Sequence, residues 1–483
     1  MEQTKLNGTT ADTIVALATP PGTGGIAVAR LSGPDAVAIA DSVWRGKSLS
    51  GVASHTAHLG EIIDEDGNPI DKALVTVFRG PHSFTGEDTV EFSLHGSRWI
   101  QRATVARLTA AGARAATAGE FTRRAFLNNR LDLAQAEAVA DLIAAESKAA
   151  HRLAMTQMSG SFSRKLESLR ERLVELASLL ELELDFSEEE VEFADRSRLL
   201  ALVQEVLDQI DRIVSTYRAG KAFKEGVPVA IAGRPNAGKS TLLNRLLGED
   251  RAIVSDIPGT TRDIIEDTRE INGILFRFFD TAGLRETDDT VEQMGIDRAM
   301  SAIDRAAIVL WTIDATDTAN IAPELAEVRA RKAANPDSTY MVLLNKSDLS
   351  DAGQDTAHRT NPAEYPEFSC EVGQTKENSP ELIRISAKSG TGCDTLEAML
   401  SKAATREHDP EQELIVTNER HLAAMRDGSD SLRRVKEGLA SGLPTDLVSQ
   451  DLREATRHLA AITGTITTPT LLSTIFSRFC IGK

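Results

Sequence analysis

The spacing of apolar residues changes three times along the chain, near residues 131, 228 and 405. Before the first change, short apolar runs such as TIVALA and GIAVARLSG alternate with glycine and proline, a texture typical of a compact α+β domain. From 131 to 227 apolar residues recur at helical spacing, as in AEAVADLIAA and LLALVQEVLDQIDRIV, and no proline interrupts them. We therefore expect long amphipathic helices in this stretch.

A different pattern begins at Pro228. The β-branched runs VAIAG, AAIVLWTID and YMVLLNKSD alternate with helical stretches, which predicts an α/β domain with a parallel sheet. Helical spacing returns after about residue 405. We therefore expect a multidomain chain in which one all-α domain is split in sequence by an inserted α/β domain. The expected segments are 1–130, 131–226, 227–405 and 406–483.

Composition narrows the classes of function. The 483 residues include 72 acidic and 54 basic side chains, and the formal charge of −18 opposes indiscriminate binding to nucleic acid or anionic membranes. Cys370, Cys393 and Cys480 are too scattered for a disulfide framework or a structural zinc site, and they fit a reducing cytosol. Since the sequence has neither a basic leader nor a run of about 18 apolar residues, we expect a cytoplasmic protein without a membrane span.

The clearest motif is GRPNAGKS at 233–240, which fits the phosphate-binding pattern GxxxxGK[ST]. It follows a predicted strand and precedes a predicted helix, as that pattern requires. Its glycines allow backbone N–H groups to wrap phosphates, Lys239 can neutralise the β- and γ-phosphate oxygens, and Ser240 can ligate Mg²⁺. The positive end of the following helix favours the same anion.

Three further motifs, GTTRD, DTAG and NKSD, follow in the order expected of a GTPase, and the segment SAK comes after them. DTAG at 280–283 ends a strand and can sense the γ-phosphate, while Thr261 in GTTRD can add a second hydroxyl to Mg²⁺. NKSD at 345–348 ends another strand, and its aspartate can accept the two N–H donors of guanine, which adenine lacks. SAK at 386–388 supplies backbone donors near the guanine oxygen. The predicted GTP-binding residues are Asn236, Ala237, Gly238, Lys239, Ser240, Thr241, Ser255, Asp256, Ile257, Pro258, Gly259, Thr260, Thr261, Asp280, Thr281, Ala282, Gly283, Asn345, Lys346, Ser347, Asp348, Ser386, Ala387 and Lys388.

The group that handles the attacking water is not given by these motifs. Leu284 occupies the place where small signalling GTPases carry a water-orienting glutamine. Acidic side chains in the next turn are candidates to replace that glutamine, although the local sequence of each favours a solvated acid of the switch region. They are Glu286, Asp288, Asp289 and Glu292. Asn236 has an amide oxygen that can hold a monovalent cation against the phosphates, in place of an arginine finger.

The arginine-rich stretch near residue 100 and Cys480 can each be interpreted in two ways. Seven arginines and one acid lie between residues 98 and 130, which indicates either a phosphate-facing patch or a protein interface. Cys480 lies between Phe479 and Ile481, so by its neighbours it is a small buried apolar residue, although a thiolate can also act as a nucleophile.

Several segments together resemble the MnmE (TrmE) family of tRNA modification GTPases. Besides the four GTPase motifs, they are DTIVALATPPGTGGIAVARLSG, HSFTGEDTVEFSLHG, GEFTRRAFLNNRLDLAQAEAVADLI and the terminal FCIGK. The resemblance covers essentially the whole chain, and the Cys-Ile-Gly-Lys tail is its most specific part, because ordinary GTPases of this class lack it.

This resemblance implies an architecture and an activity. Residues 1–130 would form a tetrahydrofolate-binding and dimerisation domain, 131–226 and 406–483 a helical domain, and 227–405 a TrmE-type G domain. The implied protein is a homodimer that forms a heterotetramer with an FAD-dependent partner, MnmG. Together they would add a carboxymethylaminomethyl or aminomethyl group to C5 of the wobble uridine, position 34, of certain tRNAs. The implied cofactors are Mg²⁺, K⁺ and a tetrahydrofolate derivative, 5,10-methylene or 5-formyl.

The resemblance also implies roles for single residues. Glu292 falls on the family's catalytic glutamate, and Cys480 becomes a candidate catalytic residue near the folate. The implied ligands of K⁺ are Asn236, Ser255, Ile257 and Thr260, and those of Mg²⁺ are Ser240 and Thr261. The implied folate contacts are Arg30, Glu91, Arg130 and Lys483. A carboxylate such as Glu91 suits the adjacent N–H donors of a pterin, and cations suit a glutamyl tail.

A second class of function remains open at this stage. The chain can instead be a regulatory GTPase module, for example one that gates ribosome assembly, with an N-terminal domain that serves only for docking. Folate distinguishes the two hypotheses, because the regulatory one predicts no folate binding by residues 1–130 and the tail and no effect of Cys480→Ser on RNA.

Overall fold

The computed structural model describes residues 12–185, 196–248, 266–280, 303–349, 381–405, 414–477 and 479–482. It divides into two compact units. Unit 1 comprises Met1–Ile143, Thr156–Val206 and Asp427–Lys483, and unit 2 comprises Ala144–Met155 and Leu207–Arg426. Both units draw on segments far apart in the sequence, and the boundaries expected from the sequence pattern stay a prediction.

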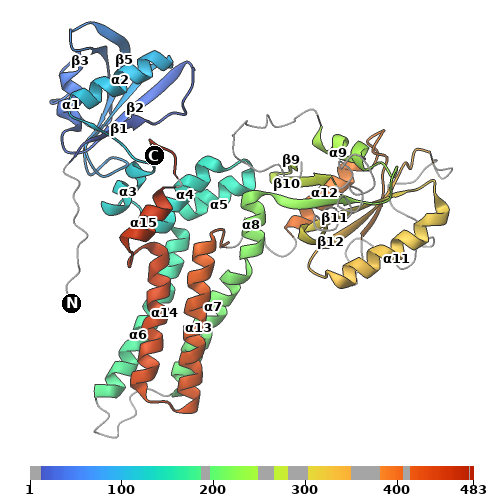
Figure 1. The fold of residues 1–483 in the computed structure, drawn as a ribbon. Helices are drawn as coiled ribbons and strands as arrows, with labels where there is room; N and C mark the ends of the chain where they lie inside the picture. The colour runs from blue at the N-terminus through green and yellow to red at the C-terminus, as the bar shows by residue number, and fades with distance from the viewer. Residues whose placement is uncertain are drawn as a thin grey trace, which may run out of the picture. The chain divides into compact units, whose positions relative to one another are not determined.

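The described part of unit 1 contains a seven-stranded sheet in the order β3-β4-β5-β6-β2-β1-β7 (Figure 1). Neighbouring strands are antiparallel except for β1 and β7, which are parallel. The strands are β1 Ile14–Leu17, β2 Ile26–Ser32, β3 Trp44–Arg45, β4 Thr56–Ile63, β5 Pro69–Phe78, β6 Thr89–His95 and β7 Arg114–Ala115.

One face of this sheet is covered by helices α1 (Ala36–Ser42) and α2 (Arg98–Ala110). Alternate residues of the strands point into that core, among them Ala29, Leu31 and Phe92. Because side chains alternate along a strand, Arg30 and Glu91 project from the opposite face. The two residues are directly paired across β2 and β6.

The other helices of unit 1 place the end of the chain against this domain. The apolar side chains Leu166, Leu169, Leu173 and Leu176 recur at helical spacing and are buried on α6, which packs along α14 (Figure 1). Helix α15 contacts α3, where Phe476 and Phe479 join a core with Leu133. The helices are α3 Glu120–Leu127, α4 Leu133–Ala144, α6 Ser161–Asp185, α14 Thr445–Thr463 and α15 Pro469–Phe476.

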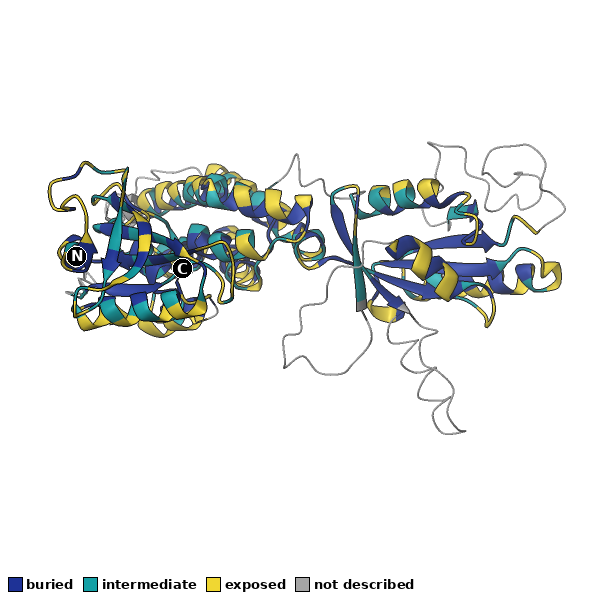
Figure 2. Cartoon of the chain, turned by 90° about the horizontal axis from the view of Figure 1, so that it is seen from above, coloured by how far each residue is buried: buried dark blue, intermediate teal, exposed yellow. Residues whose placement is uncertain are grey.

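In the described part of unit 2, a six-stranded sheet has the order β13-β12-β11-β8-β10-β9. It is parallel except for β9, which pairs antiparallel with β10. Its strands are largely buried, as the dark blue arrows of Figure 2 show. The strands are β8 Val227–Ala232, β9 Glu266–Ile271, β10 Ile274–Asp280, β11 Ile308–Asp314, β12 Thr339–Asn345 and β13 Glu381–Arg384.

Helices cover both faces of this sheet, which explains the near-continuous apolar runs of its central strands. Side chains of α9 and α12 pack on one face, and those of α11 pack on the other. These helices are α9 Lys239–Leu247, α11 Thr318–Ala334 and α12 Cys393–Ala404. The sheet and its helices confirm the predicted inserted α/β P-loop domain.

The remaining helices of the described residues are α5 Lys148–Met158, α7 Arg196–Ser215, α8 Tyr217–Glu225 and α13 Glu419–Ser441. They confirm the long helices expected on both sides of the α/β segment, and with the sheet of unit 1 they complete the predicted multidomain fold. Among the described residues, no helix combines the length and the apolarity needed to span a membrane.

Candidate nucleotide-binding site and docked C-terminal tail

The GRPNAGKS segment forms a tight loop between the end of β8 and the start of α9. Gly233, Asn236 and Gly238 all have positive φ, at 132°, 64° and 94°. A side chain at Gly233 would overlap the carbonyl oxygen of Thr312, and one at Gly238 would overlap the side-chain amide of Asn345. Both positions therefore require glycine, for backbone conformation and for space.

Lys239 and Ser240 open helix α9 at this loop. The Lys239 ammonium is buried and donates hydrogen bonds of 2.8 Å to the carbonyl oxygens of Gly233 and Arg234, so it lies over the loop. Ser240 and Thr241 are exposed in the first helical turn. A cation, two hydroxyls and the positive end of a helix dipole are therefore gathered where the sequence predicts phosphate and Mg²⁺.

Asn345 connects the phosphate-binding loop to the segment 386–388. Its side-chain nitrogen donates to the carbonyl oxygen of Ala237 at 2.8 Å, and its side-chain oxygen accepts from the Ala387 N–H at 2.9 Å. The side chain is buried, with 2% of its surface exposed. One amide thus joins three motifs. Asn345 is 108 residues from Ala237 and 42 residues from Ala387 in the sequence.

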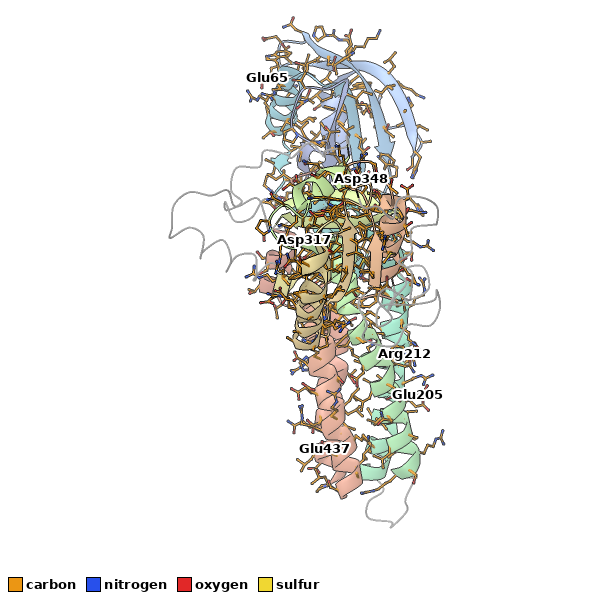
Figure 3. All side chains as sticks on the ribbon, turned by 90° about the vertical axis from the view of Figure 1, so that its right-hand side faces the viewer. Glu65, Glu205, Arg212, Asp317, Asp348 and Glu437 are labelled. Atoms are coloured by element: carbon orange, nitrogen blue, oxygen red, sulfur yellow. The ribbon has the colours of Figure 1, made fainter. Side chains whose placement is uncertain are left out.

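The turn after β12 holds the predicted guanine-reading residues. Asp348 is exposed there (Figure 3), while the Ser347 N–H donates to the carbonyl oxygen of Ile385 at 3.1 Å. Lys346 has a φ of 62°, and its ammonium pairs with Asp314 at 2.6 Å. Burial acts to raise the pKa of Asp314, but the hydrogen bonds from Lys346 and Thr316 together outweigh it and the pKa is lowered.

Arg245 belongs to this site although no motif marks it. Its guanidinium donates to the carbonyl oxygens of Ala387 at 3.2 Å and Lys388 at 2.6 Å. Arg245 belongs to helix α9, so these hydrogen bonds attach the 386–388 loop to that helix. Sequence reasoning missed it because its partners are more than 140 residues away.

Part of the predicted nucleotide site lies outside the described residues, including the whole of GTTRD and all of DTAG after Asp280. Those residues are Ser255, Asp256, Ile257, Pro258, Gly259, Thr260, Thr261, Thr281, Ala282, Gly283 and Glu292. Asp280 ends β10, and its backbone is in register with Ile231 of β8. The strand that carries DTAG is therefore the neighbour of the strand that carries the phosphate-binding loop.

In unit 1, two of the predicted folate residues meet. Arg30 and Glu91 form a half-buried ion pair of 2.7 Å on the face of the sheet opposite α1 and α2. The Arg30 guanidinium also lies 5.6 Å from the ring centre of Phe84 and 5.7 Å from that of Phe121. Arg130 is exposed, and its aliphatic carbons lie beside Gly86. A carboxylate acceptor, a guanidinium donor and aromatic faces are together suited to binding a flat heterocycle.

The C-terminal tail docks on the same domain. Residue Ile481 forms an antiparallel bridge with Ala118, and the Gly119 N–H donates to the Cys480 carbonyl oxygen at 3.4 Å. Gly482 has a φ of 99°, and a Cβ there would overlap the carbonyl oxygen of Leu17. Cys480 is exposed, so the expectation that it is a buried apolar residue is wrong. Lys483 lies outside the described residues.

Most of the arginine-rich stretch is engaged inside the domain. Arg124 is 1% exposed and pairs with Asp12, Glu87 and the fully buried Glu120. Burial acts to raise the pKa of Glu120, but hydrogen bonds from Arg114 and Thr117 lower it to about 2. Arg123 also pairs with Glu120, and Arg107 donates to the Ile63 carbonyl oxygen at 3.2 Å. Four of the seven arginines therefore bond to groups within the domain. The sequence analysis missed this network, because it considered only a phosphate-facing patch or a protein interface.

Comparisons with known proteins agree with this geometry over nearly the whole chain. Residues 13–130 match the family model of the GTP-binding protein TrmE N-terminus, and residues 133–480 match that of the MnmE helical domain. The tRNA modification GTPase MnmE of Cytophaga hutchinsonii is 47% identical over 474 residues, which cover 98% of each chain. The chain belongs to the MnmE family of tRNA modification GTPases. The MnmE protein of Porphyromonas gingivalis is 48% identical over 479 residues, again 98% of each chain.

Solved structures add little to this family assignment. An Era variant of Aquifex aeolicus bound to GDP and aluminium fluoride covers 42% of this chain and 65% of its own, with 28% identity. The TM-score of that match is 0.27, too low to bear on function. The MnmE assignment therefore rests on the two family models and the relatives that match from end to end.

Proposed function

We propose that this chain is a K⁺-activated GTP hydrolase that acts in the modification of the tRNA wobble uridine. The GTP hydrolase and its action in tRNA modification follow from membership of the MnmE family. The observation that carries the nucleotide-binding part of the proposal is the Asn345 amide, which joins the phosphate-binding loop to the 386–388 loop. That bridge supports one continuous site for GTP with Mg²⁺, because phosphate and base are read by loops held at a fixed separation.

The proposed hydrolysis uses residues of three loops. Ser240 and Thr261 would ligate Mg²⁺, and Asp280, at the end of β10, would support that site. Asn236, Ser255, Ile257 and Thr260 would hold K⁺, which supplies positive charge where other GTPases use an arginine finger. Glu292 would orient the attacking water. The exposed Asn236 in the left-handed region of the loop supports the cation role, because its side chain is open to solvent beside the phosphate-binding backbone.

The proposed folate site lies in unit 1. Glu91 would accept from the N–H donors of a 5,10-methylene or 5-formyl tetrahydrofolate, and Arg30, Arg130 and Lys483 would bind its anionic part. The Arg30–Glu91 pair and the docked tail support this proposal, because both belong to the same unit. The exposed Cys480 would then act on the uracil ring or the one-carbon unit.

The chemistry on tRNA is proposed to need a second protein. An FAD-dependent partner, MnmG, would join a homodimer of this chain in a cytoplasmic heterotetramer. The complex would add a carboxymethylaminomethyl or aminomethyl group to C5 of uridine 34. Within the chain, residues 1–130 would bind folate and dimerise, 131–226 and 406–483 would form the helical domain, and 227–405 would bind GTP.

GTP hydrolysis measured in matched KCl and NaCl tests the nucleotide part of the proposal. We expect strong stimulation by K⁺ in the native chain and its loss in Asn236→Ala and Glu292→Ala. The two variants should differ in binding, since Asn236→Ala removes a cation ligand while Glu292→Ala leaves GTP affinity intact. Equal rates in both salts, with both variants active, would refute K⁺ activation and these two roles.

Folate binding separates this proposal from a regulatory GTPase module. Titration with 5-formyl tetrahydrofolate should show saturable binding that is weakened at least tenfold in Glu91→Gln. Cys480→Ser should bind folate normally but fail to restore modified uridine in cells that lack the native chain. No folate binding, together with normal uridine modification by Cys480→Ser, would favour the regulatory module.

A further inference from the structure

Helix α2 begins with an exposed aromatic residue between two cations. Trp99 has 64% of its surface exposed, whereas the other tryptophans of the chain, Trp44 and Trp311, are 7% and 5% exposed. Arg98 and Arg102 are also exposed. Arg102 follows Arg98 by four positions and Trp99 by three, so its side chain is the neighbour of both on the helix surface.

These two arginines differ from most of the arginine-rich stretch. Arg107, Arg114, Arg123 and Arg124 are engaged with carboxylates or a backbone carbonyl. Arg98 and Arg102 form neither an ion pair nor a side-chain hydrogen bond with any residue that the structure describes. Helix α2 itself contains no aspartate or glutamate. Unneutralised cations are therefore concentrated beside Trp99 in a chain with a formal charge of −18.

Two backbone segments meet beside this surface. The loop before β2 lies against the segment before α2, since the Gly24 N–H donates to the Gly96 carbonyl oxygen at 3.1 Å. A side chain at Gly96 would overlap the backbone of Gly24. His95 ends β6, opposite Ile26, and is held by Asp71 at 2.7 Å through Nδ1, which leaves the rest of its ring exposed. Ile26 is itself 70% exposed.

From these observations we propose that Trp99, Arg98 and Arg102 form an RNA-contact surface that stacks an unpaired base of the tRNA. An exposed indole offers a flat face to any base, and flanking guanidinium groups pair with the phosphates on either side of it. The inference rests on the proposed function in one respect, that tRNA is the substrate. It adds a place on this chain where that RNA is held.

A second copy of this chain fits the same surface poorly. In a twofold dimer whose axis passed through this surface, Arg98 and Arg102 would approach the same arginines of the partner. Like charges brought together without an acid between them oppose association. A polyanion with exposed bases satisfies both the cations and the aromatic face.

The position of Trp99 makes the test direct, because the other two tryptophans are buried. The full chain would be titrated with a 17-nucleotide anticodon stem-loop and, as comparison, a blunt RNA duplex of equal charge, with tryptophan emission and filter binding recorded together. We expect the stem-loop to quench emission and the duplex to leave it nearly unchanged. In Trp99→Phe the quenching should vanish while affinity changes less than threefold, because phenylalanine also stacks.

Two further variants separate stacking from charge. Trp99→Ala should weaken stem-loop binding about tenfold, within the 1–3 kcal/mol typical of one base stack, at an unchanged salt dependence. Arg98→Gln/Arg102→Gln should lower the slope of log affinity against log salt by about 1.4, the value for two phosphates of a single strand. The matched control is Arg433→Gln/Arg457→Gln on α13 and α14, which should leave that slope unchanged.

Several results would overturn the inference. They are stem-loop binding without any change in emission, Trp99→Ala binding as the native chain does, or a shift of Trp99→Ala toward monomer in sedimentation velocity, which would assign the surface to self-association. Failure of the chain to bind any RNA would overturn it as well. The proposed function is judged separately, by uridine 34 modification in complemented cells, which can remain normal in each of these cases.

Discussion

The side-chain nitrogen of Asn345 lies 2.8 Å from the carbonyl oxygen of Ala237, so the strand end that carries NKSD is hydrogen-bonded to the phosphate-binding loop. The same amide accepts from Ala387. Asn345 is thus a structural link between base recognition and phosphate recognition, in addition to any contact with the nucleotide.

Asn345→Ala should weaken GDP binding by at least tenfold. The change removes two buried hydrogen bonds and leaves the Ala387 N–H without its acceptor, at a cost of about 1–3 kcal/mol. Fluorescent GDP titration measures the affinity. Asn272→Ala is the matched control, because Asn272 donates to Ser401 at an exposed site and should bind GDP as the native chain does. Equal affinities for the two variants would contradict the linking role.

Gly238→Ala should abolish tight nucleotide binding. The new methyl group would overlap the Asn345 amide at a backbone with φ of 94°, so the loop must shift. Gly248 ends the same helix with φ of 62°, and nothing lies within 4 Å of a Cβ there. Gly248→Ala should therefore lose some stability yet keep its GDP affinity. If the two variants bind GDP equally well, space at Gly238 is not what limits the site.

Gly482→Ala should weaken 5-formyl tetrahydrofolate binding while GTP hydrolysis stays at the native rate. Gly482 follows the Ile481 bridge with Ala118 and adopts positive φ against the Leu17 carbonyl oxygen, so a methyl group there must displace the docked tail. Displacing it would move Cys480 and the terminal lysine. Ile481→Ala, at a neighbouring side chain that is 66% exposed, serves as the control and should bind folate normally. Native folate affinity in Gly482→Ala would rule out a role for the docked tail.

The Glu120 network should make unit 1 sensitive to acid. The pKa of Glu120 is about 2 in the folded chain against an ordinary 4.5, so its stabilisation is present above pH 4.5 and is lost as the pH falls toward 2. A shift of this size corresponds to on the order of 3 kcal/mol. Thermal melts between pH 3 and 7 should show a smaller loss of Tm for Glu120→Gln than for the native chain.

Glu65→Gln provides the reference for that experiment, since Glu65 is exposed on unit 1 (Figure 3). It should reproduce the native dependence of Tm on pH. A Glu120→Gln curve that runs parallel to the native one would mean that acid destabilises this unit through other groups.

Local patterns were sufficient to predict the elements that carry the nucleotide site. The strand, glycine-containing loop and helix of GRPNAGKS are found as β8, residues 233–238 and α9, because backbone conformation there depends on a few neighbouring residues. The change from mixed to helical to α/β spacing likewise indicated the two sheets and the flanking helices, since each spacing reflects which face of an element is buried.

Only the tertiary structure decided which distant residues meet. Arg245 reaches the 386–388 loop, Arg124 is buried among three carboxylates, and Cys480 is exposed in the tail whose next residue, Ile481, pairs with Ala118. Arginines in one stretch of sequence consequently differ in their environment. Arg124 forms internal ion pairs, whereas Arg98 is exposed to solvent. A sequence determines local conformation through neighbouring residues, whereas burial and pairing depend on chain segments that fold together from more than 100 positions away.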